Sequence, residues 1–178
     1  MAQSIIRSSI IRSSPRTPVT APEITQLLAI IDAAYDHKSW HGTNLRGSLR
    51  GLTVAQAAWR PAPNRHNIWE LIVHAAYWKY IGLRRLTSGA RGSFPLNGSN
   101  WMSRPQEASD KALKADVALL GDMHRALRDA VSALSPRDLA ATPAGSKVSN
   151  LALLSGVAAH DLYHAGQIQL LKRLAPLR

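Results

Sequence analysis

The stretch His160-Asp-Leu-Tyr-His164-Ala-Gly-Gln167-Ile lies near the C-terminus and sets two histidines four residues apart in an apolar segment. The spacing of the apolar residues predicts a helix that packs against a core. Its predicted inward stripe consists of Leu153, Val157, His160, His164, Gln167 and Leu171. Residues four apart on a helix share a face, so both imidazoles can reach one position. A single metal ion fits there, because neutral imidazole is a common ligand of zinc and similar metals.

The histidine pair also has an interpretation without a metal. Two core histidines can form hydrogen bonds with other protein groups, or the pair can face solvent. Burying an unpaired polar group costs roughly 1–3 kcal/mol, so inward-facing imidazoles need polar partners if no metal is bound. The pair alone does not favour either interpretation.

The composition restricts the kind of site this chain can form. The 178 residues fit one domain, and the absence of cysteine excludes disulfides, thiolate zinc sites and a cysteine nucleophile. A metal site must therefore use histidine and oxygen ligands. The net charge of +11 is spread along the chain, which predicts attraction for anionic ligands and no nucleic-acid-binding arm. We expect no transmembrane helix, and we expect a cytoplasmic protein.

The first residues differ from the rest of the chain. The sequence Ser-Ile-Ile-Arg-Ser-Ser occurs at 4–9 and again at 9–14, and two prolines follow. We interpret residues 1–21 as a disordered leader or a non-native start, and residues 22–178 as the folded domain.

Helical patterns begin at Pro22. A first helix is expected to run to about Asp36, followed by a break at 38–44 that contains His41. After a proline-containing loop, Asn67 and Glu70 form a capping box that predicts the start of a second helix.

The second half of the chain continues this pattern. The second helix is expected to end at Gly89 and to carry His74 on its inward stripe, and residues 89–105 form a long loop. A third helix is predicted from about Pro105 to Leu134, and the last helix begins at Ser149 or Asn150. Four amphipathic helices predict an all-α four-helix bundle, in which sites are built from inward side chains of facing helices.

Two segments carry a family resemblance. The segment Trp59-Arg-Pro-Ala-Pro-Asn-Arg-His-Asn-Ile-Trp-Glu-Leu-Ile-Val-His74, together with His160-Asp-Leu-Tyr-His164-Ala-Gly-Gln-Ile, resembles the DinB / YfiT-like superfamily of four-helix metalloproteins. The resemblance covers residues 22–175. It implies a divalent metal ion, zinc or nickel, bound by His74, His160 and His164. It also implies a homodimer, a low-molecular-weight thiol as co-substrate, and a bacterial stress response.

The leading hypothesis is a metal-dependent transferase or hydrolase with a small-molecule substrate. Three histidines leave a coordination position open for a water or a thiol, as in catalytic zinc sites. Because the chain has no cysteine, a nucleophilic thiol must come from a small molecule. Candidate catalytic residues are Gln167, which is also a candidate for helix packing, and His41. We expect Asp161 to be a surface charge or a dimer contact, with a partner that orients an imidazole as the alternative, and His124 to be a core or interface residue.

Other functions receive less support from the sequence. A non-enzymatic, metal-stabilised binding or stress-response module is the main alternative. A protease is disfavoured, because only 14 residues follow His164 in this sequence, which leaves little room for a further downstream ligand. A nucleic-acid binder is suggested by the high charge alone.

Overall fold

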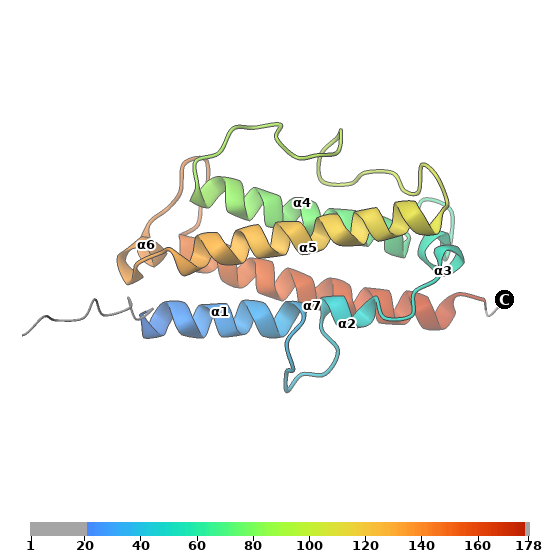
Figure 1. Cartoon of the computed structure of the whole chain (residues 1–178), viewed down its shortest axis with the longest axis horizontal. Coiled ribbons are helices and arrows are strands. Elements are labelled where there is room, and N and C mark those ends of the chain that lie inside the picture. The colour runs from blue at the N-terminus through green and yellow to red at the C-terminus, as the bar shows by residue number, and fades with distance from the viewer. Residues whose placement is uncertain (1–20, 177–178) are drawn as a thin grey trace, which may run out of the picture.

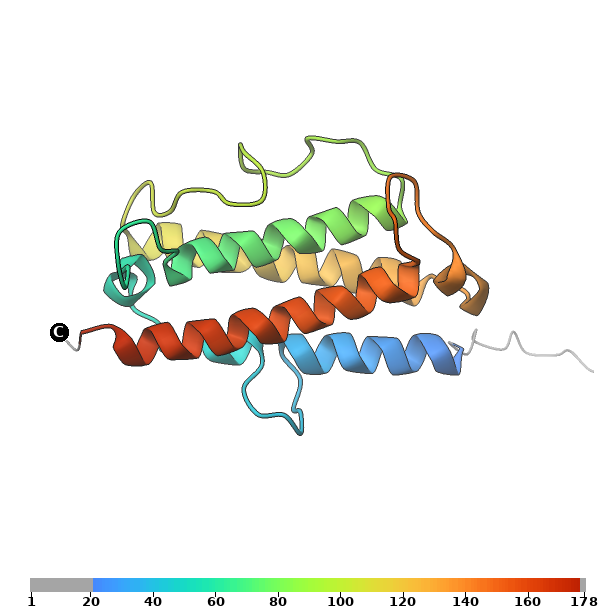
Figure 2. The same cartoon turned by 180° about the vertical axis from the view of Figure 1, so that it is seen from behind.

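The computed structural model describes residues 21–176, and within this range it contains helices and no β-strand (Figure 1). Four long helices run side by side along the long axis of the molecule (Figures 1 and 2). They are α1 (Pro22–Tyr35), α4 (Ile68–Leu86), α5 (Asp110–Ser132) and α7 (Asn150–Leu174). Three short helices lie in the connections: α2 (Leu45–Ser48), α3 (Val54–Ala58) and α6 (Pro136–Ala140). The predicted all-α four-helix bundle is confirmed.

The packing of the long helices defines the seams of the bundle. Helix α4 packs against α5 and α7, and α1 packs against the same two helices. Helices α1 and α4 therefore occupy opposite corners, and α4 and α7 share one seam. The histidines identified in the sequence lie on these last two helices.

The start of α4 follows the sequence prediction. The Asn67 side chain accepts a hydrogen bond from the Glu70 backbone amide at 2.8 Å, and the Glu70 carboxylate accepts one from the Asn67 amide. This capping box satisfies amides that the first turn of a helix leaves without partners. It fixes where α4 begins and hence where His74 lies on the helix.

The start of α5 differs from the prediction. The helix begins at Asp110 and not near Pro105, because the Ser109 side chain accepts a hydrogen bond from the Ala112 amide and caps it there. The segment around Arg104 is instead held against the start of α4. The Asn67 side-chain amide donates to the Arg104 carbonyl at 2.7 Å. A contact with the preceding helix thus replaces the first predicted turn of α5.

The buried face of α7 is also rotated relative to the predicted stripe. Leu153, His160, Gln167 and Leu171 are half-buried. The fully buried positions include Leu154, Val157, Asp161, His164 and Ile168. The expectation that Asp161 is a surface charge or a dimer contact is wrong, because its side chain is 1 % exposed and pairs with Lys79 of α4. A sequence pattern assigns a charged residue to the surface. The predicted buried face of α7 is therefore shifted by one residue from the observed face.

Two further sequence predictions concern the leader and membrane spans. The expected leader at 1–21 lies, apart from Ala21, outside the described residues, so the predicted domain boundary stays a prediction. Among the helices of residues 21–176, none is long and apolar enough to cross a membrane.

Candidate metal centre

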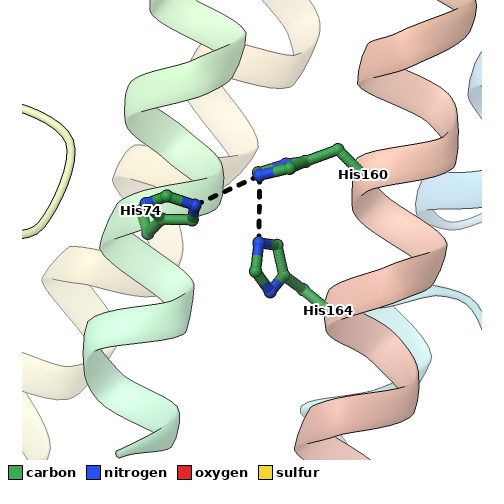
Figure 3. Close-up of side chains that lie close together, drawn as sticks. All are labelled: His74, His160 and His164. Carbon is green, nitrogen blue, oxygen red and sulfur yellow. Dashed lines mark hydrogen bonds between the residues drawn. The ribbon is translucent and has the colours of Figure 1, made fainter. Parts of the chain in front are cut away.

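Three histidines meet on the seam between α4 and α7 (Figure 3). His74 projects from α4, and His160 and His164 project from successive turns of α7. The Nε2 atom of His160 lies 3.1 Å from Nε2 of His74 and 3.0 Å from Nε2 of His164. A set of one ring nitrogen from each residue lies within 4.8 Å of one another. The structure therefore brings together the three side chains proposed as metal ligands.

Hydrogen bonds at the far side of two rings fix their tautomers. The Nδ1 atom of His74 lies 2.9 Å from the Asn100 carbonyl oxygen, and Nδ1 of His164 lies 2.7 Å from Oε1 of Gln167. Both oxygens can only accept, so each Nδ1 carries the proton. The Nε2 lone pairs of His74 and His164 are then free, and each is directed toward His160.

The third ring cannot satisfy both of these lone pairs well. A proton on Nε2 of His160 serves one neighbour and leaves the other lone pair without a donor. The Nδ1 atom of His160 is buried and has no hydrogen-bond partner. Buried lone pairs without a donor are costly, whereas a cation among the three Nε2 atoms would accept all three of them, with the proton of His160 on its Nδ1. The donor set therefore fits a bound divalent metal ion.

Burial keeps the three imidazoles neutral near pH 7. Removal from solvent lowers the pKa of His160 to about 3 and that of His74 to about 4, and it also lowers the pKa of His164. The neighbouring histidines contribute to the lowered pKa of His160, because two imidazolium charges would repel. Metals bind the neutral form of imidazole. The site therefore requires little deprotonation when a metal binds.

The long connection between α4 and α5 covers one side of the site. The indole of Trp101 stacks on the ring of His74, with centroids 3.7 Å apart and planes 6° from parallel. On its other face, Trp101 stacks on His66 at 3.6 Å. The side-chain oxygen of Asn100 accepts a hydrogen bond from the Trp78 indole at 3.0 Å. This segment therefore holds His74 through both a backbone carbonyl and an aromatic ring.

The other candidates lie in different places. Gln167 contacts the His164 imidazole and so is placed to orient that ring. His41 lies in an exposed segment between α1 and α2 and is not part of the histidine group found in the described residues. His124 is buried in the core, where it stacks on Tyr35 with centroids 3.8 Å apart.

The sequence offers Asn100 and Trp101 of the long loop as candidates to line the mouth of a pocket, but it does not predict their contacts with His74. The contact of His74 with Asn100 uses a backbone carbonyl, which every residue has, so no sequence signal identifies it. His66 precedes the second helix in the sequence, and its stacking on Trp101 depends on how a distant loop folds back. The presence of two aromatics in that loop, Phe94 and Trp101, was the available signal that it packs against the body.

The fold and the histidine cluster together define a four-helix bundle with a candidate metal site on two facing helices. In a comparison with models of protein families, residues 38–168 match the DinB superfamily. The matched range includes all three histidines and covers most of the chain, so the protein belongs to the DinB superfamily. No curated protein and no solved structure matches the chain.

Proposed function

We propose that this protein is a metal-dependent enzyme that binds a divalent ion through Nε2 of His74, His160 and His164. The observation that carries the proposal is the convergence of three neutral imidazoles, two buried and one half-buried, whose lone pairs cannot all be satisfied within the protein. Three protein ligands leave a fourth position of a tetrahedral ion open, as in catalytic zinc sites. A nitrogen donor set suits zinc or nickel.

We propose further that the reaction is an S-transfer or isomerisation with a low-molecular-weight thiol. A bound ion would lower the pKa of a coordinated water or hold a thiol as thiolate. The chain contains no cysteine, so the thiol would be supplied by a second molecule. Asn100 and Gln167 would orient two of the imidazoles, and Trp101 would shield the face of His74 from water. Family membership supports a homodimer, a cytoplasmic location and a stress-response role as accompanying proposals.

One observation favours a non-enzymatic alternative. Two cavities of the described chain, of about 820 and about 450 Å³, are lined by residues other than the three histidines. A metal without an adjacent substrate cavity would stabilise the bundle and would have no catalytic role. In that case the protein is a metal-stabilised binding module, and thiol consumption would not depend on the metal.

Elemental analysis of protein purified without a metal-affinity tag tests metal binding. We expect about one equivalent of zinc or nickel in the wild type, from the single three-ligand group, and loss of the metal in His74→Ala and His160→Ala. The matched control is His37→Ala, because His37 is an exposed histidine away from the cluster. Wild-type protein that holds no metal and gains no thermal stability from added zinc or nickel would overturn the proposal.

A second assay separates the enzyme from the binding module. Metal-loaded and metal-stripped protein are incubated with a small thiol and an electrophile, and thiol loss is followed. We expect turnover in the loaded protein, and its disappearance in His160→Ala. Metal binding without turnover across a panel of thiols would favour the binding module.

A further inference from the structure

A cavity of about 450 Å³ lies between α4 and the long connection that follows it. Its size is in the range of small-molecule sites. Aromatic and apolar side chains form much of its wall, and two arginines complete it. The residues that carry the argument are Tyr77, Tyr80, Ile81, Arg84, Arg91 and Phe94.

The aromatic wall of this cavity is held in place by packing and hydrogen bonds. Phe94 is 8 % exposed, and its ring lies 5.4 Å from the rings of both Tyr77 and Tyr80. The Tyr80 hydroxyl accepts a hydrogen bond from the Ser93 amide at 3.2 Å and donates one to the Ala90 carbonyl at 3.3 Å. The loop is therefore fastened to α4 at this point, and the cavity is formed before a ligand arrives.

The two arginines give the cavity a positive charge that no acidic side chain of the described residues neutralises. Among residues 21–176, neither Arg84 nor Arg91 forms a salt bridge, and no acidic side chain lines the cavity. Arg84 lies in the last turn of α4, where the helix dipole favours a cation. Arg91 lies in the loop, where no helix dipole accounts for a positive charge. Two arginines in the wall of a partly apolar cavity raise the positive potential there.

We propose that this cavity binds a small, flat organic carboxylate. Arg84 and Arg91 contact the carboxylate, because the guanidinium group matches its geometry with paired hydrogen bonds. Tyr77 and Phe94 contact the flat body of the ligand. The proposal goes beyond the metal-dependent function and needs no bound metal.

The cavity is close to the metal centre but separate from it. The ring of Tyr77 lies edge-on to Trp78 at 6.2 Å, and Trp78 lies edge-on to His160 at 6.1 Å. One indole therefore stands between the aromatic wall and the histidines. The cavity is also lined by Ser99, whose neighbour Asn100 accepts the hydrogen bond from His74.

Isothermal titration calorimetry with benzoate tests the proposal, with benzamide as an uncharged analogue of the same shape. We expect saturable binding of benzoate and binding of benzamide that is at least about tenfold weaker. We expect Arg84→Gln and Arg91→Gln each to weaken benzoate binding by about tenfold or more, because a charge-assisted hydrogen bond is lost. Arg137→Gln is the matched control, since Arg137 is an exposed arginine on α6.

Three results of the titration would overturn the proposal. They are the absence of saturable benzoate binding, equal binding of benzoate and benzamide, and a loss of binding in the Arg137→Gln control as large as in the Arg84 and Arg91 variants. Circular dichroism establishes that each variant is folded. Metal content, measured in the same samples, is expected to be unchanged in Arg84→Gln and Arg91→Gln, so failure here is distinguishable from failure of the metal site.

Discussion

Lys79 and Asp161 form an ion pair in the middle of the bundle, where their side chains are 0 % and 1 % exposed. They belong to α4 and α7, the two helices that carry the histidines, and Asp161 directly follows His160. The Lys79 ammonium also lies 3.5 Å from Nδ1 of His124 and 4.9 Å from the centre of the Tyr35 ring. This ion pair thus links α4 and α7 at a buried position where apolar side chains usually pack.

Removing one partner of this pair is expected to destabilise the fold strongly. Lys79→Met leaves the Asp161 charge buried and unpaired, and Asp161→Leu does the same to Lys79. Each change should lower the free energy of unfolding by about 3–5 kcal/mol, measured by urea denaturation. The double variant removes both charges and should be more stable than either single variant.

The exposed pair of Arg125 and Asp122 provides the control for this experiment. Both side chains are largely in solvent, so Arg125→Ala should change the free energy of unfolding by less than about 1 kcal/mol. Losses from Lys79→Met and Asp161→Leu that simply add in the double variant would contradict the idea that an unpaired buried charge causes them.

The pair also shows where sequence reasoning stops. The four long helices, the capping box at Asn67 and the spacing of His160 and His164 depend on residues close together in the chain and are predictable from it, whereas the start of α5 at Asp110 is not. The burial of Asp161 depends on a partner 82 residues away. A single sequence does not show that Lys79 reaches it, so the sequence pattern assigns Asp161 to the surface and predicts a buried face of α7 that differs from the observed one.

The candidate metal site is likewise predictable only in part from the sequence. The family resemblance predicted which histidines converge, and the structure brings those side chains together. The groups that orient them were predictable only in part. Gln167 lies one turn from His164 and was a candidate, whereas the Asn100 carbonyl is a backbone atom in a loop whose path has no periodic pattern to read.

Gln167 is expected to affect metal affinity without being a ligand. Its side-chain oxygen accepts the Nδ1 proton of His164, which fixes the ring and its tautomer. Loss of such a partner typically weakens metal binding about 10–100-fold, and we expect this for Gln167→Leu in a competition titration against a chromophoric chelator. Gln169→Leu is the control, since the Gln169 side chain donates its hydrogen bond to Thr43 on another segment. Equal affinities for both variants would show that the hydrogen bond does not support the site.

Trp101 is expected to support the site through its stacking on His74. Loss of an aromatic contact costs roughly 0.5–1.5 kcal/mol, so Trp101→Ala should weaken metal binding by about two- to tenfold. Trp101→Phe keeps a ring in the stack and should show a smaller effect in the same titration. Trp40→Ala serves as the control, because Trp40 is fully exposed. An effect of Trp40→Ala as large as that of Trp101→Ala would refute a specific role for the stack.

His124 makes the stability of the bundle depend on pH. It is 3 % exposed, and burial lowers its pKa to about 3, with the Lys79 charge contributing in the same direction. Asp32, whose carboxylate lies 3.8 Å from Nε2 of His124, acts in the opposite direction but does not offset burial. The folded protein therefore keeps His124 neutral at pH values where the unfolded chain protonates it.

Because the folded pKa of His124 is below the unfolded value, the unfolded state binds the extra proton as pH falls below about 6.5. Stability from this residue is fully present above that pH and is lost progressively toward pH 3, the folded pKa. Between pH 8 and pH 5 the loss should be about 2 kcal/mol. Urea denaturation of metal-free wild type and His124→Phe, which keeps a ring against Tyr35, measures it. We expect the wild type to lose about 2 kcal/mol more than the variant over this range, and parallel losses would mean that His124 is protonated without cost in the folded bundle.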